Sequence, residues 1–141
     1  MLYTLIELGT LKPGDKVVVP AVSWSTDLAP VIQLGLEAIL CDCNMQDLSV
    51  DLDHLNQIIK KESPKALLLV SVLGLVPQME TIVDICNKNN VILLEDACES
   101  IGSEHNYKKI GNFGEMSSFS SYFGHHISTI EGGMVCTNDK T

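Results

Sequence analysis

The chain has 141 residues, and 45% of them are hydrophobic, which is enough apolar material for one domain with its own core. Its formal net charge is −9, so we expect no non-specific binding to nucleic acid or to anionic membranes, because both favour basic surfaces. No apolar run approaches the roughly 20 residues of a membrane-spanning helix, and the first residues do not read as a secretory signal.

The cysteines are spaced neither as a disulfide framework nor as a zinc site. Cys41 and Cys43 are separated by a single residue, which is closer than the ligands of a zinc knuckle usually lie. We therefore expect reduced, mostly buried thiols and a cytoplasmic protein.

Apolar strands and amphipathic helices alternate along the first two thirds of the chain. We expect strands at 17–20, 38–42, 66–73 and 91–94, and helices at 25–34, 51–61 and 79–89. Ser23 or Ser25 is the expected cap of the first of these helices. The segment 66–73 is almost continuously apolar, as in a buried parallel strand. The alternation predicts an α/β fold in which helices cover a sheet.

The rhythm changes after Asp96. Residues 102–114 are rich in glycine, asparagine and lysine, and we expect a hairpin or an irregular loop there. Strands are expected at 116–123 and 133–137. Because the chain begins inside a helical pattern and stops just after a strand, we expect it to be part of a larger domain.

Three polar clusters follow predicted strands, at 23–25, 95–99 and 120–126. The carboxyl ends of strands are where ligands bind in open α/β sheets. An aromatic ring, acids, a hydroxyl and a histidine at one edge could hold a flat, phosphorylated ring.

Each candidate also has a structural interpretation. Trp24 could anchor the core or the surface, and Asp96 could cap a helix. Ser120 could be satisfied by backbone, and His125 could be a solvated loop residue. Adjacent residues such as His125 and His126 rarely face one ion together, so we expect no metal site.

Several segments together carry a resemblance to a known family: LKPGDKVVVP, SWSTDLAPVIQLG, LLEDACESIGS, the turn at 111–114, and FSSYFGHHISTIEGGMV. In this order and spacing the chain resembles the DegT/StrS family of pyridoxal-phosphate-dependent nucleotide-sugar aminotransferases. The resemblance implies the three-layer αβα large domain of fold-type I transferases. Residues 1–141 would then be a partial large domain, truncated at both ends and lacking the small C-terminal domain. The family is usually homodimeric.

The resemblance also implies roles for individual residues. Asp96 matches the aspartate that pairs with the pyridine nitrogen, and Trp24 matches the aromatic residue that stacks on the ring. Ser120 matches the serine that binds the cofactor phosphate. Glu99 matches a polar position on the helix behind the ring.

His125 lies where the family's aminotransferases have the lysine that binds the cofactor covalently. An imidazole has no primary amine, but it can act as a general base. This departure resembles the branch of 3-dehydratases that make 3,6-dideoxysugars, for example for the lipopolysaccharide O-antigen. It implies a pyridoxal or pyridoxamine phosphate held non-covalently, a 4-keto-6-deoxy nucleotide-sugar substrate, and glutamate as the amino donor.

Alternatives remain open. Cys98 matches an iron–sulfur ligand of the glucose-type dehydratases, whereas Ile130 favours the mannose type. Lys108 or Lys109 could replace the missing lysine in an ordinary sugar aminotransferase. The chain could also be a non-catalytic relative, and alone we expect it to bind the cofactor weakly and to show no turnover.

Overall fold

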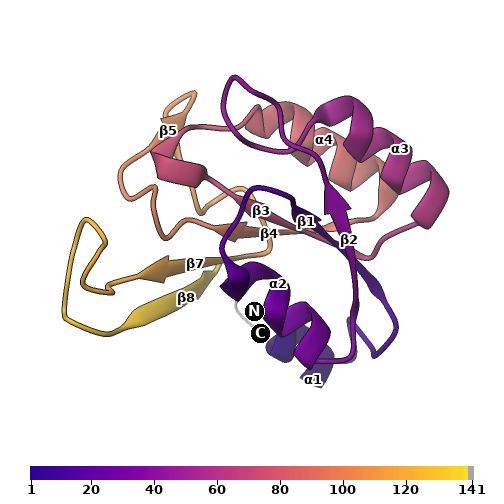
Figure 1. The fold of residues 1–141 in the computed structure, drawn as a ribbon, viewed down its shortest axis with the longest axis horizontal. Helices are drawn as coiled ribbons and strands as arrows, with labels where there is room; N and C mark the ends of the chain where they lie inside the picture. Colours follow the sequence, from indigo (N-terminus) through magenta and orange to yellow (C-terminus); the bar gives the residue numbers. More distant parts are fainter. Residues whose placement is uncertain (140–141) are drawn as a thin grey trace.

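A computed structural model describes residues 1–139 of the chain. Its helices cover both faces of one mixed sheet, and a small hairpin lies beside it (Figure 1). The elements are α1 Leu2–Glu7, β1 Lys16–Pro20, α2 Ser25–Gln33, β2 Glu37–Cys41, α3 Leu52–Glu62, β3 Ala66–Val70, the 3-10 turn Val72–Gly74, α4 Met79–Asn89, β4 Ile92–Asp96, β5 Glu104–His105, β6 Lys108–Lys109, β7 Met116–Ser120 and β8 Gly133–Thr137. No helix within this described part is long and apolar enough to cross a membrane.

The sheet has the strand order β2-β1-β3-β4-β7-β8. All neighbouring strands are parallel except β8, which runs antiparallel to β7. The carboxyl ends of β1, β3, β4 and β7 therefore lie along one edge of the sheet.

Alternating side chains of the strands build two separate core layers. Val18, Leu67 and Leu69 face α3 and α4, whereas Val17 and Val19 face α1 and α2. Successive side chains of a strand point to opposite faces, so a run that is apolar throughout needs helices on both sides. The predicted three-layer αβα architecture is confirmed.

Two local predictions are wrong for identifiable reasons. The N-cap of α2 is Trp24 rather than Ser23 or Ser25, because the Asp27 carboxylate accepts the Trp24 backbone N–H at 3.1 Å. The Ser23 hydroxyl instead donates to the Pro20 carbonyl at 3.1 Å. Strand β3 ends at Val70, short of the predicted residue 73, because the chain turns there with Leu73 at φ 54°.

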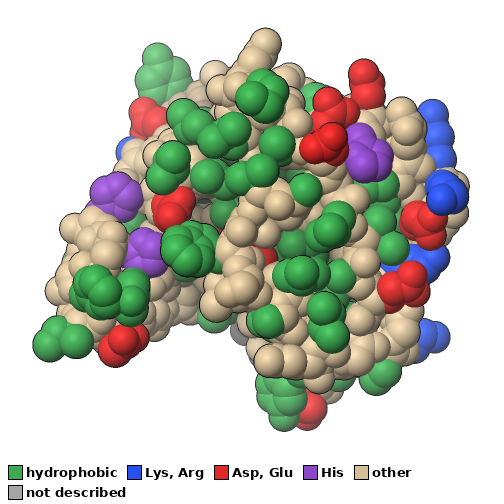
Figure 2. Space-filling model, in the orientation of Figure 1, with side chains coloured by type: hydrophobic (Ala, Val, Ile, Leu, Met, Phe, Trp, Pro, Cys, Tyr) green, Lys and Arg blue, Asp and Glu red, His purple; other side chains and the backbone are tan. Residues whose placement is uncertain are grey.

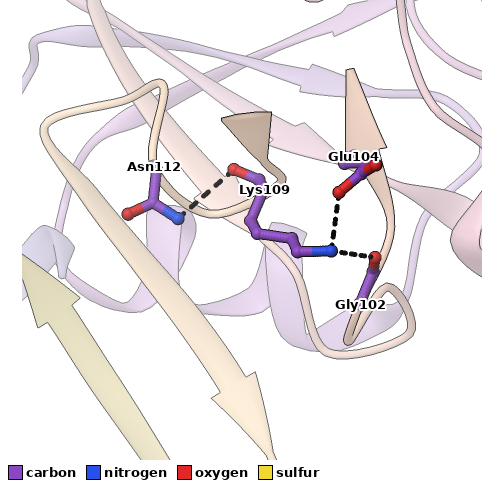
Figure 3. A network of polar contacts seen from close by, with 4 residues as sticks. All are labelled: Gly102, Glu104, Lys109 and Asn112. Carbon is purple, nitrogen blue, oxygen red and sulfur yellow. Dashed lines mark hydrogen bonds and ion pairs between the residues drawn. The ribbon is translucent and has the colours of Figure 1, made fainter. Parts of the chain in front are cut away.

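The hairpin predicted within 102–114 is confirmed as β5–β6. Asn106 and Tyr107 join its strands, and both have positive φ, 49° and 63°, as a two-residue hairpin turn requires. The Lys109 ammonium donates to the Glu104 carboxylate at 2.7 Å and to the Gly102 carbonyl at 3.1 Å (Figure 3). The Asn112 amide donates to the Lys109 carbonyl at 3.3 Å, which ties the hairpin to the turn that follows it.

Candidate functional site

The candidate site begins where the direction of the sheet's connections reverses. Strand β1 is followed by α2 on one face of the sheet, while α3 leads back to β3 across the other face. The loops that leave β1 and β3 therefore diverge, and such a point is where open α/β sheets bind ligands. Trp24 follows β1 and Leu73 follows β3.

Glu99 connects these two loops. One oxygen of its carboxylate accepts the Trp24 indole N–H at 3.2 Å, and the other accepts the Leu73 backbone N–H at 2.7 Å. The Trp24 side chain is 63% exposed, so the ring is oriented by Glu99 but a face remains accessible. Trp24 and Glu99 are 75 positions apart in sequence, and the fold brings them into contact.

The helix that we expected to carry Glu99 is absent. Residues 97–102 form turns, in which the Ala97 amide donates to the Ser118 carbonyl at 2.9 Å and the Cys98 amide donates to the Asp96 carboxylate at 2.9 Å. Both bonds hold the chain against the end of β4 and β7 instead of releasing it into a helix. Asp96 is accordingly the last residue of β4 and does not cap a helix.

Asp96 lies among other acidic and thiol groups. Burial raises the pKa of the Cys98 thiol to about 12, and a hydrogen bond with Asp96 and its charge act in the same direction. The thiol therefore stays protonated at neutral pH and is not an activated nucleophile.

A second carboxyl group, Asp27, faces Asp96, and the sequence analysis did not single it out. Burial, followed by the charge of Asp96 and a hydrogen bond with it, raises the pKa of Asp27 to about 7. A signal was present in the sequence, because Asp27 precedes the apolar Val31 by four positions and so lies on the same face of α2. Asp27 and Val31 are both buried, whereas Asp96 is half-buried.

Ser120 lies on the same edge as Asp96. The register of the parallel strands pairs Asp96 with Ser118, so Ser120 ends β7 two residues further on. Its hydroxyl oxygen accepts the Tyr122 N–H at 3.2 Å, and a hydroxyl that accepts one bond can still donate its proton.

His125 lies in the loop that joins β7 to β8. Its backbone N–H donates to the Tyr122 carbonyl at 3.0 Å, and the centres of the two rings are 6.1 Å apart. No hydrogen bond or ring contact among residues 1–139 joins His125 to Asp96 or Trp24. The structure thus brings Trp24 and Glu99 into contact beside Asp96, and leaves His125 on the loop beyond the same edge.

Gly132 and Gly133, at the start of β8, allow this loop to close tightly. A β-carbon at Gly132 would lie 2.6 Å from the Ser121 hydroxyl oxygen, and one at Gly133 would lie 2.8 Å from the Phe119 carbonyl oxygen. Ser121 and Thr129 also share a hydrogen bond of 2.7 Å across the loop. The Gly-Gly pair therefore has a packing reason that is independent of any ligand.

The lysines closest in sequence to the site are engaged elsewhere. Lys109 bonds to Glu104 and Gly102, and the Lys108 ammonium lies 4.5 Å from the centre of the Phe113 ring. Most Lys side chains visible in Figure 2 gather at its right edge, over α3. Neither Lys108 nor Lys109 has a contact with Asp96 among the described residues.

The architecture is shared with solved pyridoxal-phosphate-dependent enzymes, among them an E. coli GDP-4-keto-6-deoxy-D-mannose-3-dehydratase with bound hydrated PLP (TM-score 0.87, 43% identity, covering 93% of this chain and 33% of that one). The chain belongs to the DegT/DnrJ/EryC1/StrS aminotransferase family, whose model matches residues 1–141. The predicted family and fold class are therefore confirmed.

The names of individual relatives are more specific than the description of the family. A GDP-4-keto-6-deoxy-D-mannose 3-dehydratase of Yersinia pseudotuberculosis is 45% identical over 92% of this chain and 33% of its own length. A GDP-perosamine synthase of Escherichia coli O157:H7 is 34% identical over 97% of this chain and 37% of its own length. The solved GDP-4-keto-6-deoxymannose-3-dehydratase with a trapped PLP-glutamate geminal diamine has a TM-score of 0.88 and 42% identity, covering 93% of this chain and 34% of that one. The chain thus spans about a third of the length of these relatives.

Proposed function

We propose that residues 1–141 form part of the cofactor-binding large domain of a pyridoxal-phosphate-dependent nucleotide-sugar 3-dehydratase. Its substrate would be GDP-4-keto-6-deoxymannose, and its product a precursor of a dideoxysugar of lipopolysaccharide. The observation that carries the proposal is His125, which stands at the family's lysine position in a chain that is 45% identical to a dehydratase of this specificity. The higher identity to the dehydratase than to the perosamine synthase agrees with it.

The residues of the sheet edge fit a flat, anionic pyridine cofactor. The exposed indole ring of Trp24 is fixed at its nitrogen by Glu99, which suits a stacking surface. Asp96 offers a carboxylate for the ring N–H, and Ser120 retains a hydroxyl proton for a phosphate oxygen. When bound in its amine form, pyridoxamine phosphate would supply the amine that meets the sugar ketone and an electron sink for the adjoining carbon.

The protein's own part in the reaction is binding and proton transfer. Trp24, Asp96, Glu99 and Ser120 would hold the cofactor, and the His125 imidazole nitrogen would accept a proton as a general base. Without a lysine, nothing in the site completes the proton shift that leaves an amine on the sugar. Overall the C3 hydroxyl is lost, and glutamate is oxidised to 2-oxoglutarate and ammonia, which supplies the reducing electrons.

A second candidate is a sugar aminotransferase, which the 34% identity to a GDP-perosamine synthase favours. It requires a lysine that bonds covalently to the cofactor. The engagement of Lys108 and Lys109 in the β5–β6 hairpin speaks against either of them in that role. The homodimer and the cytoplasmic location expected from the sequence stay predictions.

Borohydride trapping separates the two candidates. The protein, expressed from its complete reading frame, is incubated with pyridoxal phosphate and borohydride, and in parallel with pyridoxamine phosphate, glutamate and GDP-4-keto-6-deoxymannose. We expect no covalent label on the wild type, ammonia release with a 3-deoxy sugar, and a loss of about 100-fold or more in ammonia release for His125→Asn. His125→Lys should become labelled, and Lys108→Ala should behave as the wild type. A labelled wild type that yields an aminated sugar would overturn the proposal.

A further inference from the structure

Asp27 is a buried acid without a matching cation. Its side chain is 3% exposed, and its carboxylate accepts one backbone N–H, that of Trp24, at 3.1 Å. The other acid that is buried among residues 1–139, Glu95, accepts three backbone N–H groups, from Gly111, Phe113 and Gly114, at 2.6–2.7 Å. The two buried carboxyl groups are therefore stabilised very differently.

The groups that face Asp27 are acidic or neutral. They are Asp96, at the end of β4, and the following Cys98 and Glu99. The sequence contains no arginine, and the lysines in ion pairs of the described residues, Lys16, Lys61, Lys88 and Lys109, pair with acids outside this group. None of these four ion pairs therefore places a lysine ammonium beside Asp96.

Two carboxyl groups in hydrogen-bonding contact cannot both ionise readily, so one retains a proton that lies between them. Asp27 is the more buried member, and burial and Asp96 together raise its pKa to about 7. Asp96 is less buried, and its carboxylate accepts the Cys98 N–H at 2.9 Å, so the geometry favours Asp27 as the donor and Asp96 as the acceptor of the bond between them.

We propose that Asp27 is a positioning residue of the cofactor site: its carboxyl group is protonated and donates a hydrogen bond to the Asp96 carboxylate. Asp96 is then held from two sides, by Asp27 and by the Cys98 amide, with a single negative charge available to the N–H of a pyridine ring. This role rests on the proposed function, because it is the cofactor ring that gives the orientation of Asp96 a purpose. Near neutral pH the pair would change from one negative charge to two.

Carbon-13 NMR of aspartate-labelled protein tests the shared proton without any cofactor. We expect one aspartate carboxyl to titrate with a midpoint of about 7, and a second carboxyl signal, that of Asp96, to shift with the same midpoint. Asp27→Asn, which keeps a hydrogen-bond donor, should abolish both changes. Asp53→Asn, an exposed aspartate in the first turn of α3, should remove one signal and leave the step near neutrality.

Adding pyridoxamine phosphate then tests whether the Asp27–Asp96 pair interacts with the cofactor ring. A ring N–H cation beside Asp96 favours ionised carboxyls, so the midpoint should move to lower pH when the cofactor is added. A wild type in which every aspartate titrates in the ordinary acidic range would overturn the shared proton, whether or not the cofactor binds. A step near neutrality that the cofactor leaves unchanged would instead overturn the cofactor-directed role and count against the proposed function.

Discussion

At the scale of single residues, Glu99 does most to connect the parts of the site. Its two carboxylate oxygens accept N–H groups from different loops, one after β1 and one after β3. Hydrogen bonds to an ionised acceptor are stronger than neutral ones, even where the side chain is only half-buried. The orientation of the Trp24 ring therefore depends on Glu99.

Replacing Glu99 by glutamine should release this ring. Glutamine has one acceptor oxygen, so its amide NH2 would face either the Trp24 indole or the Leu73 amide, and one bond is lost. We expect a loss of stability of about 0.5–1.5 kcal/mol, together with easier quenching of Trp24 fluorescence by acrylamide. Trp24 is the only tryptophan, so the emission reports this position alone. Glu104→Gln, in the β5–β6 hairpin, should leave the quenching unchanged, and an unaltered Glu99→Gln variant would contradict the bridging role.

Residue roles were only partly visible in the sequence. The resemblance at LLEDACESIGS pointed to Glu99 and that at SWSTDLAPVIQLG to Trp24, and the fold brings this pair together, although their roles toward a cofactor stay predictions. Asp27 was missed because an aspartate near a helix start is usually a solvated cap. The spacing to Val31 indicates which face of α2 carries Asp27, but the partner at the carboxyl end of β4 is distant in sequence, and no local pattern in α2 reveals it.

At the scale of elements, Glu95 fixes the turn before β7. Its buried carboxylate accepts the amides of Gly111, Phe113 and Gly114, and so ties residues 111–114 to β4. A β-carbon at Gly114 would lie 2.5 Å from the Leu93 carbonyl oxygen, which shows how closely the turn approaches the strand. Glu95 thus positions β7, and with it Ser120.

Glu95→Gln should destabilise the fold more than a surface change does. The amide group of glutamine would direct its own N–H groups at backbone donors, leaving buried donors unpaired. We expect a loss of about 1–3 kcal/mol in the free energy of unfolding, measured with urea. The matched change Glu104→Gln breaks an exposed ion pair with Lys109, and its cost should stay below about 1 kcal/mol. Equal losses in the two variants would refute this role of Glu95.

The elements with strong periodicity were the most predictable. The helix predicted at 79–89 matches α4, because its apolar positions recur regularly and Asn90, with φ 53°, ends it. The predicted strand at 66–73 extended too far, since apolar residues continue into the turn where Leu73 meets Glu99. Composition alone cannot distinguish a buried strand from an apolar turn whose backbone is bound by a distant side chain.

At the scale of the whole molecule, some acidic side chains stabilise the fold when they are ionised, and others stabilise it when they are protonated. The half-buried Glu62 bonds to Lys16 and Lys61, and these bonds hold the pKa of Glu62 below its usual value. That contribution to stability is present above the ordinary pKa of a glutamate and is lost in acid. Asp27 acts in the opposite direction, because its pKa is raised in the folded chain.

The sign of the Asp27 contribution follows from proton binding. Between the ordinary value of 3.8 and about 7, the folded chain binds a proton at Asp27 that the unfolded chain has released. Stability from this group is therefore fully present below 3.8 and is lost as the pH rises through about 7. The slope for one group cannot exceed about 1.4 kcal/mol per pH unit.

Comparing the wild type with Asp27→Asn isolates this contribution from that of Glu62 and every other acid. The asparagine amide can donate to Asp96 and its oxygen can accept the Trp24 N–H, so it imitates the protonated acid at every pH. In urea unfolding, we expect the two proteins to differ little below a pH of about 3.8, where Asp27 is protonated in both the folded and the unfolded chain. The variant should become progressively more stable than the wild type as the pH rises from about 3.8 to about 7, and the difference should level off above that range. A difference that stays constant over this range would mean that Asp27 is ionised throughout, and that the acid pair at the sheet edge holds no proton.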